Sequence, residues 1–183
     1  MSENDEIIKR KEKSGELERN SEVIPTPTGN ERIIGYAFVV ADLLHYGHIN
    51  FLRQCKKYCD FLIVGIYTDE LTATYKRTPI IPFWQRKELL KELKCVDLIV
   101  NVYFGERDQT YPMRRLVEKG WKIKYLFHGS DWNLRDPDLI SAKNYIESIG
   151  GELIQPPYTK GINTTMIIDI IKRRKIEEKQ KGW

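Results

Sequence analysis

Two of the chain's three histidines, His45 and His48, lie three residues apart in the tract ADLLHYGHIN, residues 41–50. At the first turn of a helix, two residues at this spacing share one face. Free backbone N–H groups and the helix dipole favour an anion there, and both imidazoles can donate hydrogen bonds to phosphate oxygens. Gly47 between them lets a ligand approach the backbone closely. Such a pair alone is more often an ordinary cap or surface pair, so its meaning depends on its neighbours.

Three further tracts carry residue types that suit a phosphorylated ligand. In GINTTM, residues 161–166, hydroxyls and backbone N–H groups can open a helix around an anion. YKR, residues 75–77, places two cations in a loop, and HGSDW, residues 128–132, offers a carboxylate and an indole that can stack on a base. Each tract also has an ordinary interpretation: a helix cap, a solvated basic pair and a half-buried tryptophan. Neither common glycine-rich phosphate motif occurs, so phosphate would be held in another way.

The composition is that of an ordinary soluble globular protein. The 183 residues are 41% hydrophobic and 31% charged, with a net charge of +4, which suits an anionic small ligand. No apolar stretch approaches the roughly 20 residues of a membrane span, and no secretory signal is visible. The three cysteines, an odd and low count, predict packed, reduced thiols and a cytoplasmic location. The interleaved glutamates of IKRRKIEEKQK, residues 171–181, favour a solvated helix over a nucleic-acid contact.

The hydrophobic pattern alternates between buried strands and amphipathic helices. Strands are predicted at residues 32–40, 60–68, 96–102, 123–129 and 152–158, with helical spacing at 46–59, 82–93, 111–119, 139–149 and 166–171. This alternation predicts an α/β fold, a Rossmann-like doubly wound five-stranded parallel sheet with helices on both faces. We expect a flexible N-terminal arm at residues 1–31, one folded domain at 32–174 and a charged C-terminal tail at 175–183.

The tracts with candidate chemistry all follow predicted strands. Ligands of such folds bind beyond the carboxyl ends of the strands, so these tracts should meet at one rim of the sheet. Two helix N-termini, two histidines, a basic loop and an aromatic side chain at one rim suit a nucleoside triphosphate and a second anionic substrate.

With these residues in place, the sequence resembles the HxGH-type nucleotidyltransferase superfamily. It is similar to the cytidylyltransferases that act on glycerol phosphate, phosphocholine and phosphoethanolamine. The similarity covers about residues 33–174. Matching tracts follow in order after the histidines: Thr68-Asp69-Glu70, Lys76, Gln85-Arg86-Lys87, Val96-Asp97 and Gly129-Ser130-Asp131-Trp132.

Finer details of the sequence look closer to the branch that transfers CMP to 2-hydroxyethylphosphonate or 2-aminoethylphosphonate. The tracts ADLLHYGHIN, TYKRTP, FHGSDW and GGELIQPPYTKGI carry this resemblance. Two departures from the family are visible. Val39-Val40-Ala41-Asp42 replaces G-T-F-D, and Tyr158 stands where the family has an arginine that contacts the nucleotide.

The resemblance implies transfer of CMP from CTP to a small phosphonate or phosphate acceptor, with release of pyrophosphate. His45, His48 and Lys76 would be catalytic, and Asp42, Lys76 and Arg86 would bind the acceptor. It implies Mg²⁺ on the triphosphate, with no protein ligand assigned to it, and a homodimer. The apolar pattern and the charged C-terminal tract described above lead us to expect no membrane or nucleic-acid partner. The implied nucleotide contacts are Val39, Val40, Gly47, His128, Gly129, Asp131, Trp132, Tyr158, Gly161, Thr164 and Thr165.

Several alternatives remain open at this stage. The acceptor could be glycerol 3-phosphate, phosphocholine or phosphoethanolamine, or the substrates could be ATP and a cofactor precursor. Loss of the family arginine before Thr159 would also fit a nucleotide-binding regulatory module without catalysis. His128 ends a predicted strand, so a structural role is as well supported as a ligand contact.

Overall fold

A computed structural model describes residues 23–29, 33–103, 110–130 and 137–180 of the chain. Within them one sheet contains the strands β1 (Ile34–Val39), β2 (Phe61–Tyr67), β3 (Leu98–Val102), β4 (Ile123–Phe127) and β5 (Glu152–Ile154). The strand order is β3-β2-β1-β4-β5, and every neighbouring pair is parallel. The chain changes direction across the sheet between β3 and β4, so β1 and β4 flank the point where a Rossmann-like sheet binds its ligands. The predicted five-stranded parallel sheet is confirmed.

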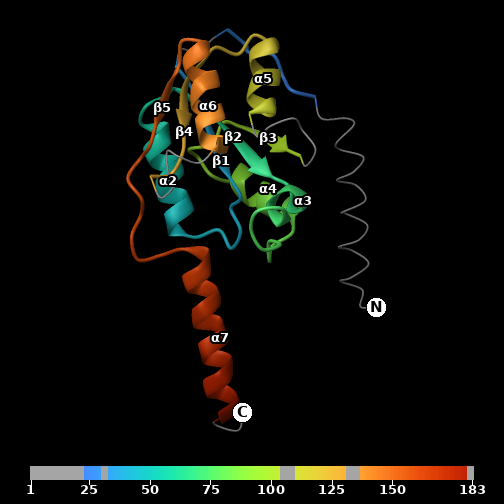
Figure 1. Cartoon of the computed structure of the whole chain (residues 1–183), viewed down its shortest axis with the longest axis vertical. Coiled ribbons are helices and arrows are strands. Elements are labelled where there is room, and N and C mark those ends of the chain that lie inside the picture. The colour runs from blue at the N-terminus through green and yellow to red at the C-terminus, as the bar shows by residue number, and fades with distance from the viewer. Residues whose placement is uncertain (1–22, 30–32, 104–109, 131–136, 181–183) are drawn as a thin grey trace.

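Helices cover both faces of this sheet (Figure 1). Buried residues of α2 and α4 pack against one face, and buried residues of α5 and α6 pack against the other. A short helix, α3, follows β2, where the hydrophobic pattern predicts no helix. The helices are α2 (Tyr46–Lys56), α3 (Asp69–Ala73), α4 (Phe83–Lys91), α5 (Tyr111–Glu118), α6 (Pro137–Ser148) and α7 (Thr164–Gln180).

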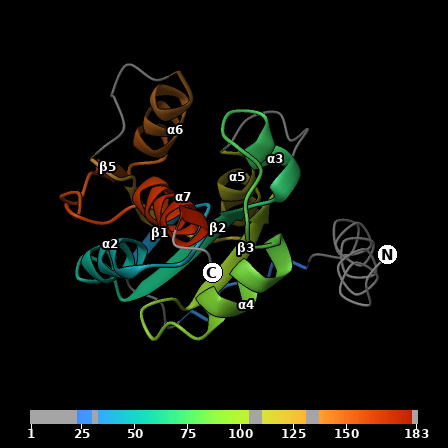
Figure 2. The ribbon, with the colours of Figure 1, turned by 90° about the horizontal axis from the view of Figure 1, so that it is seen from below.

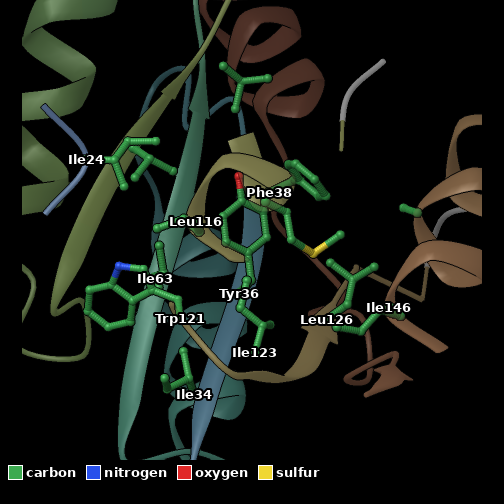
Figure 3. Packing of buried hydrophobic residues seen from close by; sticks show 14 of the residues in the cluster. Ile24, Ile34, Tyr36, Phe38, Ile63, Leu116, Trp121, Ile123, Leu126 and Ile146 are labelled. Carbon is green, nitrogen blue, oxygen red and sulfur yellow. The ribbon is translucent and has the colours of Figure 1, made fainter. Parts of the chain in front are cut away.

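Strand β1 shows how the sequence divides between the two cores. Tyr36 and Phe38 belong to the cluster with α5 and α6, while Ala37 and Val39 belong to the cluster with α2 and α4. This alternation follows from the two-residue repeat of a strand. Figure 3 shows Tyr36 at the centre of the first cluster. A central strand that is buried on both faces gives the loop at its carboxyl end a rigid base.

Part of the predicted N-terminal arm packs onto the domain. Ile24 is buried in the core, and the Trp121 indole Nε1 donates a hydrogen bond to the Pro25 carbonyl at 2.7 Å. The thiols of Cys55 and Cys59 are buried and free, as expected from the cysteine count. Burial raises the pKa of Cys59 to about 11, which keeps this thiol protonated and unreactive at neutral pH.

Helix α7 leaves the rim of the domain and projects away from it (Figure 1), and Figure 2 views it along its length. It continues to Gln180, beyond the start of the predicted tail at residue 175. No side chain is buried over residues 164–176. Across the ranges given above, no helix is both long enough and apolar enough to cross a bilayer.

Candidate active site

A cavity of about 710 Å³ opens at the carboxyl ends of the strands, where the predicted rim lies. Its walls come from the loop after β1, the first turn of α2, the segment after α3, the end of β4 and the first turn of α7. Segments that are more than a hundred residues apart in the sequence therefore form one site.

The histidine pair begins helix α2. His45 is the N-cap residue with extended backbone, and its Nδ1 accepts a hydrogen bond from the Gly47 N–H at 3.0 Å. His48 Nδ1 in turn accepts from the His45 N–H at 3.4 Å, so the two residues form a reciprocal capping box. Because each Nδ1 is an acceptor, each neutral ring carries its proton on Nε2. The sequence therefore builds two Nε2–H donors at a helix N-terminus.

Burial favours the neutral form of both rings. Burial, together with the neighbouring His45 and Lys76 and against the opposing effect of Asp42, lowers the pKa of His48 to about 4. Burial also lowers the pKa of His45. The ring centroids are 4.0 Å apart, a distance at which two imidazolium charges would repel strongly. The pair thus offers hydrogen bonds rather than fixed positive charge.

The N-terminus of α7 meets the histidines. Asn163 caps this helix, because its Oδ1 accepts from the Met166 N–H at 2.8 Å. The Thr164 hydroxyl donates to the Asp42 carbonyl at 3.0 Å and lies 3.5 Å from His45 Nε2. Two helix N-termini therefore face one cavity, the arrangement that best accommodates a polyphosphate chain.

Gly47 is required by the close packing of these two helix ends. A Cβ atom at this position would lie 2.8 Å from the His45 ring and 3.4 Å from the Ile162 carbonyl oxygen. A side chain here would displace the histidine or the turn before α7. The glycine of the H-x-G-H tract thus keeps the His45 ring in place and leaves the backbone open to a ligand.

Asp42 is almost fully buried, with 4% of its surface exposed, and its carboxylate has three partners. Oδ1 accepts from the N–H groups of Ile80 and Ile81 at 3.0 and 2.9 Å, and Oδ2 pairs with Arg77 at 2.7 Å. Burial opposes ionisation, but the two N–H donors and Arg77 outweigh it and hold the pKa of Asp42 below its usual value. The carboxylate therefore fastens the loop that follows α3.

The backbone on both sides of Asp42 is strained. Ala41 and Leu43 have φ angles of 56° and 49°, in the left-handed region that non-glycine residues rarely occupy. Backbone of this kind persists only where surrounding contacts impose it, and it is frequent at functional sites. The loop between β1 and α2 is thus held in a defined shape at the floor of the cavity.

Arg86, predicted to bind the acceptor, lies outside the cavity. Its side chain is fully buried, and its guanidinium donates to the carbonyls of Ile81, Tyr67 and Val40 and to Asp69 Oδ1. The distances to Ile81 and Tyr67 are both 2.9 Å, and that to Asp69 is 2.6 Å. With its donors directed at protein groups, Arg86 braces the ends of β1 and β2. The expected acceptor contact is therefore corrected to a structural role.

The cavity brings together most of the other predicted residues. Gly161 has φ of 85° and lies in the turn before α7, outside the lining, and Asp131 and Trp132 lie outside the described residues. Arg77 and Thr72 line the cavity without having been assigned a role from the sequence; the position of Arg77 beside Lys76 was the available signal. The predicted residues in the lining are Val39, Val40, Asp42, His45, Gly47, His48, Lys76, His128, Gly129, Tyr158, Thr164 and Thr165.

In the part of the chain covered by the structure, no group of three or more His, Cys, Asp or Glu side chains could hold a metal ion. The polar side chains around the cavity are imidazoles, hydroxyls, the Asn163 amide, two cations and one carboxylate that is already paired. This set suits a ligand that brings its own negative charge.

The parallel sheet, the paired helix N-termini and the H-x-G-H tract together form an α/β fold with a site suited to a phosphorylated ligand. The chain belongs to the cytidylyltransferase-like family, whose family model matches residues 39–170 and so spans both helix N-termini and the basic loop. The superfamily predicted from the sequence is thereby confirmed.

Two relatives and one solved structure illustrate the similarity. The bifunctional protein HldE of Geobacter metallireducens is 34% identical over 139 residues, which are 75% of this chain but 26% of that protein. The chain therefore spans about a quarter of this relative's length. The glycerol-3-phosphate cytidylyltransferase of Staphylococcus aureus is 32% identical over 138 residues, 75% of this chain and 92% of that one. A lipopolysaccharide core biosynthesis protein from Thermoplasma volcanium superposes with a TM-score of 0.55 at 27% identity, covering 71% of this chain and 98% of that chain.

Proposed function

We propose that this protein transfers CMP from CTP to a small acceptor that carries a phosphate monoester, and releases pyrophosphate. The observation that carries this proposal is the meeting of two helix N-termini in one cavity, with His45, His48 and Thr164 between them. This arrangement provides donors for several phosphate oxygens at once, and Lys76 lies on the cavity wall beside them.

The relatives support a phosphate ester more than the phosphonate expected from the sequence. The glycerol-3-phosphate enzyme matches over nearly its whole length, so the comparison concerns the same domain. A phosphonate acceptor remains the second candidate because of the tracts ADLLHYGHIN and TYKRTP. Both acceptors present an oxygen of a tetrahedral anion as the nucleophile, and the same cations would suit either one.

In the proposed reaction an acceptor oxygen attacks the α-phosphorus of CTP in line. A new P–O bond forms, the bond between the α-phosphorus and the bridging oxygen breaks, and pyrophosphate leaves with the electron pair. The Nε2–H groups of His45 and His48 would donate to the oxygens on which negative charge grows. Lys76 would draw the acceptor towards the α-phosphate. No covalent enzyme intermediate is required, because alignment and charge stabilisation carry such transfers.

The proposal includes Mg²⁺ bound to the triphosphate. The ion would neutralise part of the phosphate charge, and it commonly keeps several water ligands in such complexes. The cavity fits this arrangement because its donors are placed for anionic oxygens. The protein residues would then position the phosphates and the acceptor around the nucleotide-bound ion.

A matrix of nucleotides and acceptors tests this proposal. Pyrophosphate release would be measured with CTP or ATP against glycerol 3-phosphate, ethanolamine phosphate, phosphocholine, 2-hydroxyethylphosphonate and 2-aminoethylphosphonate. We expect CTP with a phosphate monoester to give the highest kcat/KM. Preference for ATP would overturn the choice of nucleotide. Equally negligible rates for the wild type and His48→Ala would favour a regulatory nucleotide-binding module.

A further inference from the structure

We propose that Arg77, rather than Arg86, holds the anionic group of the acceptor, and that Asp42 positions the Arg77 guanidinium for this task. This inference rests on the proposed function, because it identifies the acceptor contact within the same cavity. It names a binding residue to which the sequence assigned no role.

Arg77 has the exposure and the donors that an acceptor contact needs. It lines the cavity next to Lys76, and its side chain is 42% exposed. Nη1 donates to the Thr78 carbonyl at 3.2 Å, and Nη2 pairs with Asp42 Oδ2 at 2.7 Å. A guanidinium has five N–H donors in a rigid plane, so these two contacts engage only part of the group. The remaining edge can meet two oxygens of a phosphate or phosphonate at once.

An ion pair with Asp42 at 2.7 Å holds this guanidinium beside the buried carboxylate. The Asp42 carboxylate is itself immobilised, because Ile80 and Ile81 donate to Oδ1 from the backbone while the other oxygen meets Arg77. The strained backbone at Ala41 and Leu43 shows that the position of the carboxylate is imposed by its surroundings. Asp42 is therefore a positioning residue, and Arg77 is the group that would touch the acceptor.

The same short loop also reaches the phosphate end of the cavity. The Asp42 carbonyl accepts from the Thr164 hydroxyl, which lies beside His45. Asp42, which positions Arg77, is thus connected through one hydrogen bond to the proposed triphosphate site. This link would set the distance between the acceptor oxygen and the α-phosphorus, on which in-line attack depends.

The charges explain why the Arg77 contact should matter. The low pKa of Asp42 keeps a negative charge at the cavity wall, and an anionic acceptor would be repelled by it without a cation between them. Replacing Arg77 with an uncharged side chain removes the attraction and uncovers the carboxylate. Replacing it with lysine keeps the charge but loses the planar fork.

The test compares Arg77→Gln, Arg77→Lys and the matched control Arg53→Gln, which removes an exposed arginine of α2 outside the cavity. We expect Arg77→Gln to raise the KM for glycerol 3-phosphate by about 10- to 100-fold, the effect of losing charge-assisted hydrogen bonds. The KM of Arg77→Lys for glycerol 3-phosphate should lie between the values of Arg77→Gln and the wild type. The dissociation constant for CTP, measured by calorimetry without acceptor, should stay within about threefold of wild type, and Arg53→Gln should leave both constants unchanged.

Three outcomes decide the matter. An acceptor KM for Arg77→Gln and Arg77→Lys equal to that of Arg53→Gln overturns the role of Arg77 and leaves the proposed function intact. If Arg77→Gln weakens CTP binding by the same factor as it raises the acceptor KM, Arg77 belongs to the nucleotide site and the inference is overturned. If the wild type turns over no acceptor, calorimetric titration of glycerol 3-phosphate and 2-hydroxyethylphosphonate decides. If the wild type binds these ligands and Arg77→Gln does not, the role of Arg77 in acceptor binding holds although the proposed function fails. If Arg77→Gln still binds them, or the wild type does not bind them at all, the role of Arg77 is contradicted.

Discussion

In the proposed mechanism His45 and His48 act as neutral hydrogen-bond donors, and their replacement is the simplest change at the residue scale. We expect His48→Ala and His45→Ala each to lower kcat by about 10²- to 10³-fold, as removal of a preorganised donor does in related electrostatic sites. Tyr46→Ala is the matched control, because Tyr46 lies between them on the exposed side of α2 and does not line the cavity. Steady-state rates of pyrophosphate release would measure the effect. Equal rates for Tyr46→Ala and the two histidine variants would contradict it.

The pKa of His48 also makes stability depend on pH. Its pKa is about 4 in the folded chain, against 6.5 for a histidine exposed to solvent, so the unfolded chain binds more protons between these values. Stability should therefore fall as the pH drops from about 6.5 towards 4. Urea unfolding at pH 7 and pH 5 would measure this loss, and His48→Gln should reduce it.

A second residue titrates in a separate window. The pKa of Asp42 lies below 3.8, so its contribution is present above that pH and is lost in stronger acid. If the stability of the wild type falls only below about pH 4, the acid sensitivity belongs to carboxylates such as Asp42. That result would contradict the role of His48.

At the scale of elements, the junction of α2 and α7 depends on the absence of a side chain at Gly47. Gly47→Ala should lower kcat at least about tenfold, because the new Cβ would meet the His45 ring and displace it. Gly150→Ala is a useful comparison. Its φ of 80° makes alanine unfavourable, yet nothing lies within 4 Å of the added Cβ. That variant should lose stability in thermal melts and keep its activity, whereas full activity of Gly47→Ala would refute the packing argument.

The junction of β1, β2 and the loop before α4 depends on Arg86. Arg86→Lys should lower the free energy of unfolding by about 3 to 5 kcal/mol, because an ammonium cannot replace the planar group among three carbonyls and Asp69. Denaturant unfolding measures this cost. A stable Arg86→Lys variant with a raised acceptor KM would restore the acceptor contact that the sequence suggested.

Sequence periodicity was sufficient for the elements but not for the directions of individual side chains. The apolar runs placed all five strands and the rim, because buried parallel strands have near-continuous apolar character. Arg86 and Arg77 are both arginines near the rim, and no pattern shows that one points into the protein and the other into the cavity. The strained Ala41 and Leu43 were also invisible, since alanine and leucine carry no preference for left-handed backbone.

At the scale of the whole molecule, α7 joins the site to an exposed helix. Its first turn lines the cavity, while the rest projects from the domain (Figures 1 and 2). On this projecting part Ile170, Ile171 and Ile176 are exposed. An isolated helix of this length gains little stability in water without packing. The predicted homodimer remains a prediction, and light scattering coupled to size-exclusion chromatography would measure it.

The central claim is that the α-phosphorus of CTP, and no other, is the atom attacked. ³¹P NMR of a reaction with CTP, Mg²⁺ and glycerol 3-phosphate tests it most directly. We predict that the signals of CTP and the acceptor decline together while pyrophosphate and a diphosphate-linked cytidine product appear in equal amounts. Formation of CDP with inorganic phosphate, or of CDP with a doubly phosphorylated acceptor, would place the attack on the γ-phosphorus and contradict the account.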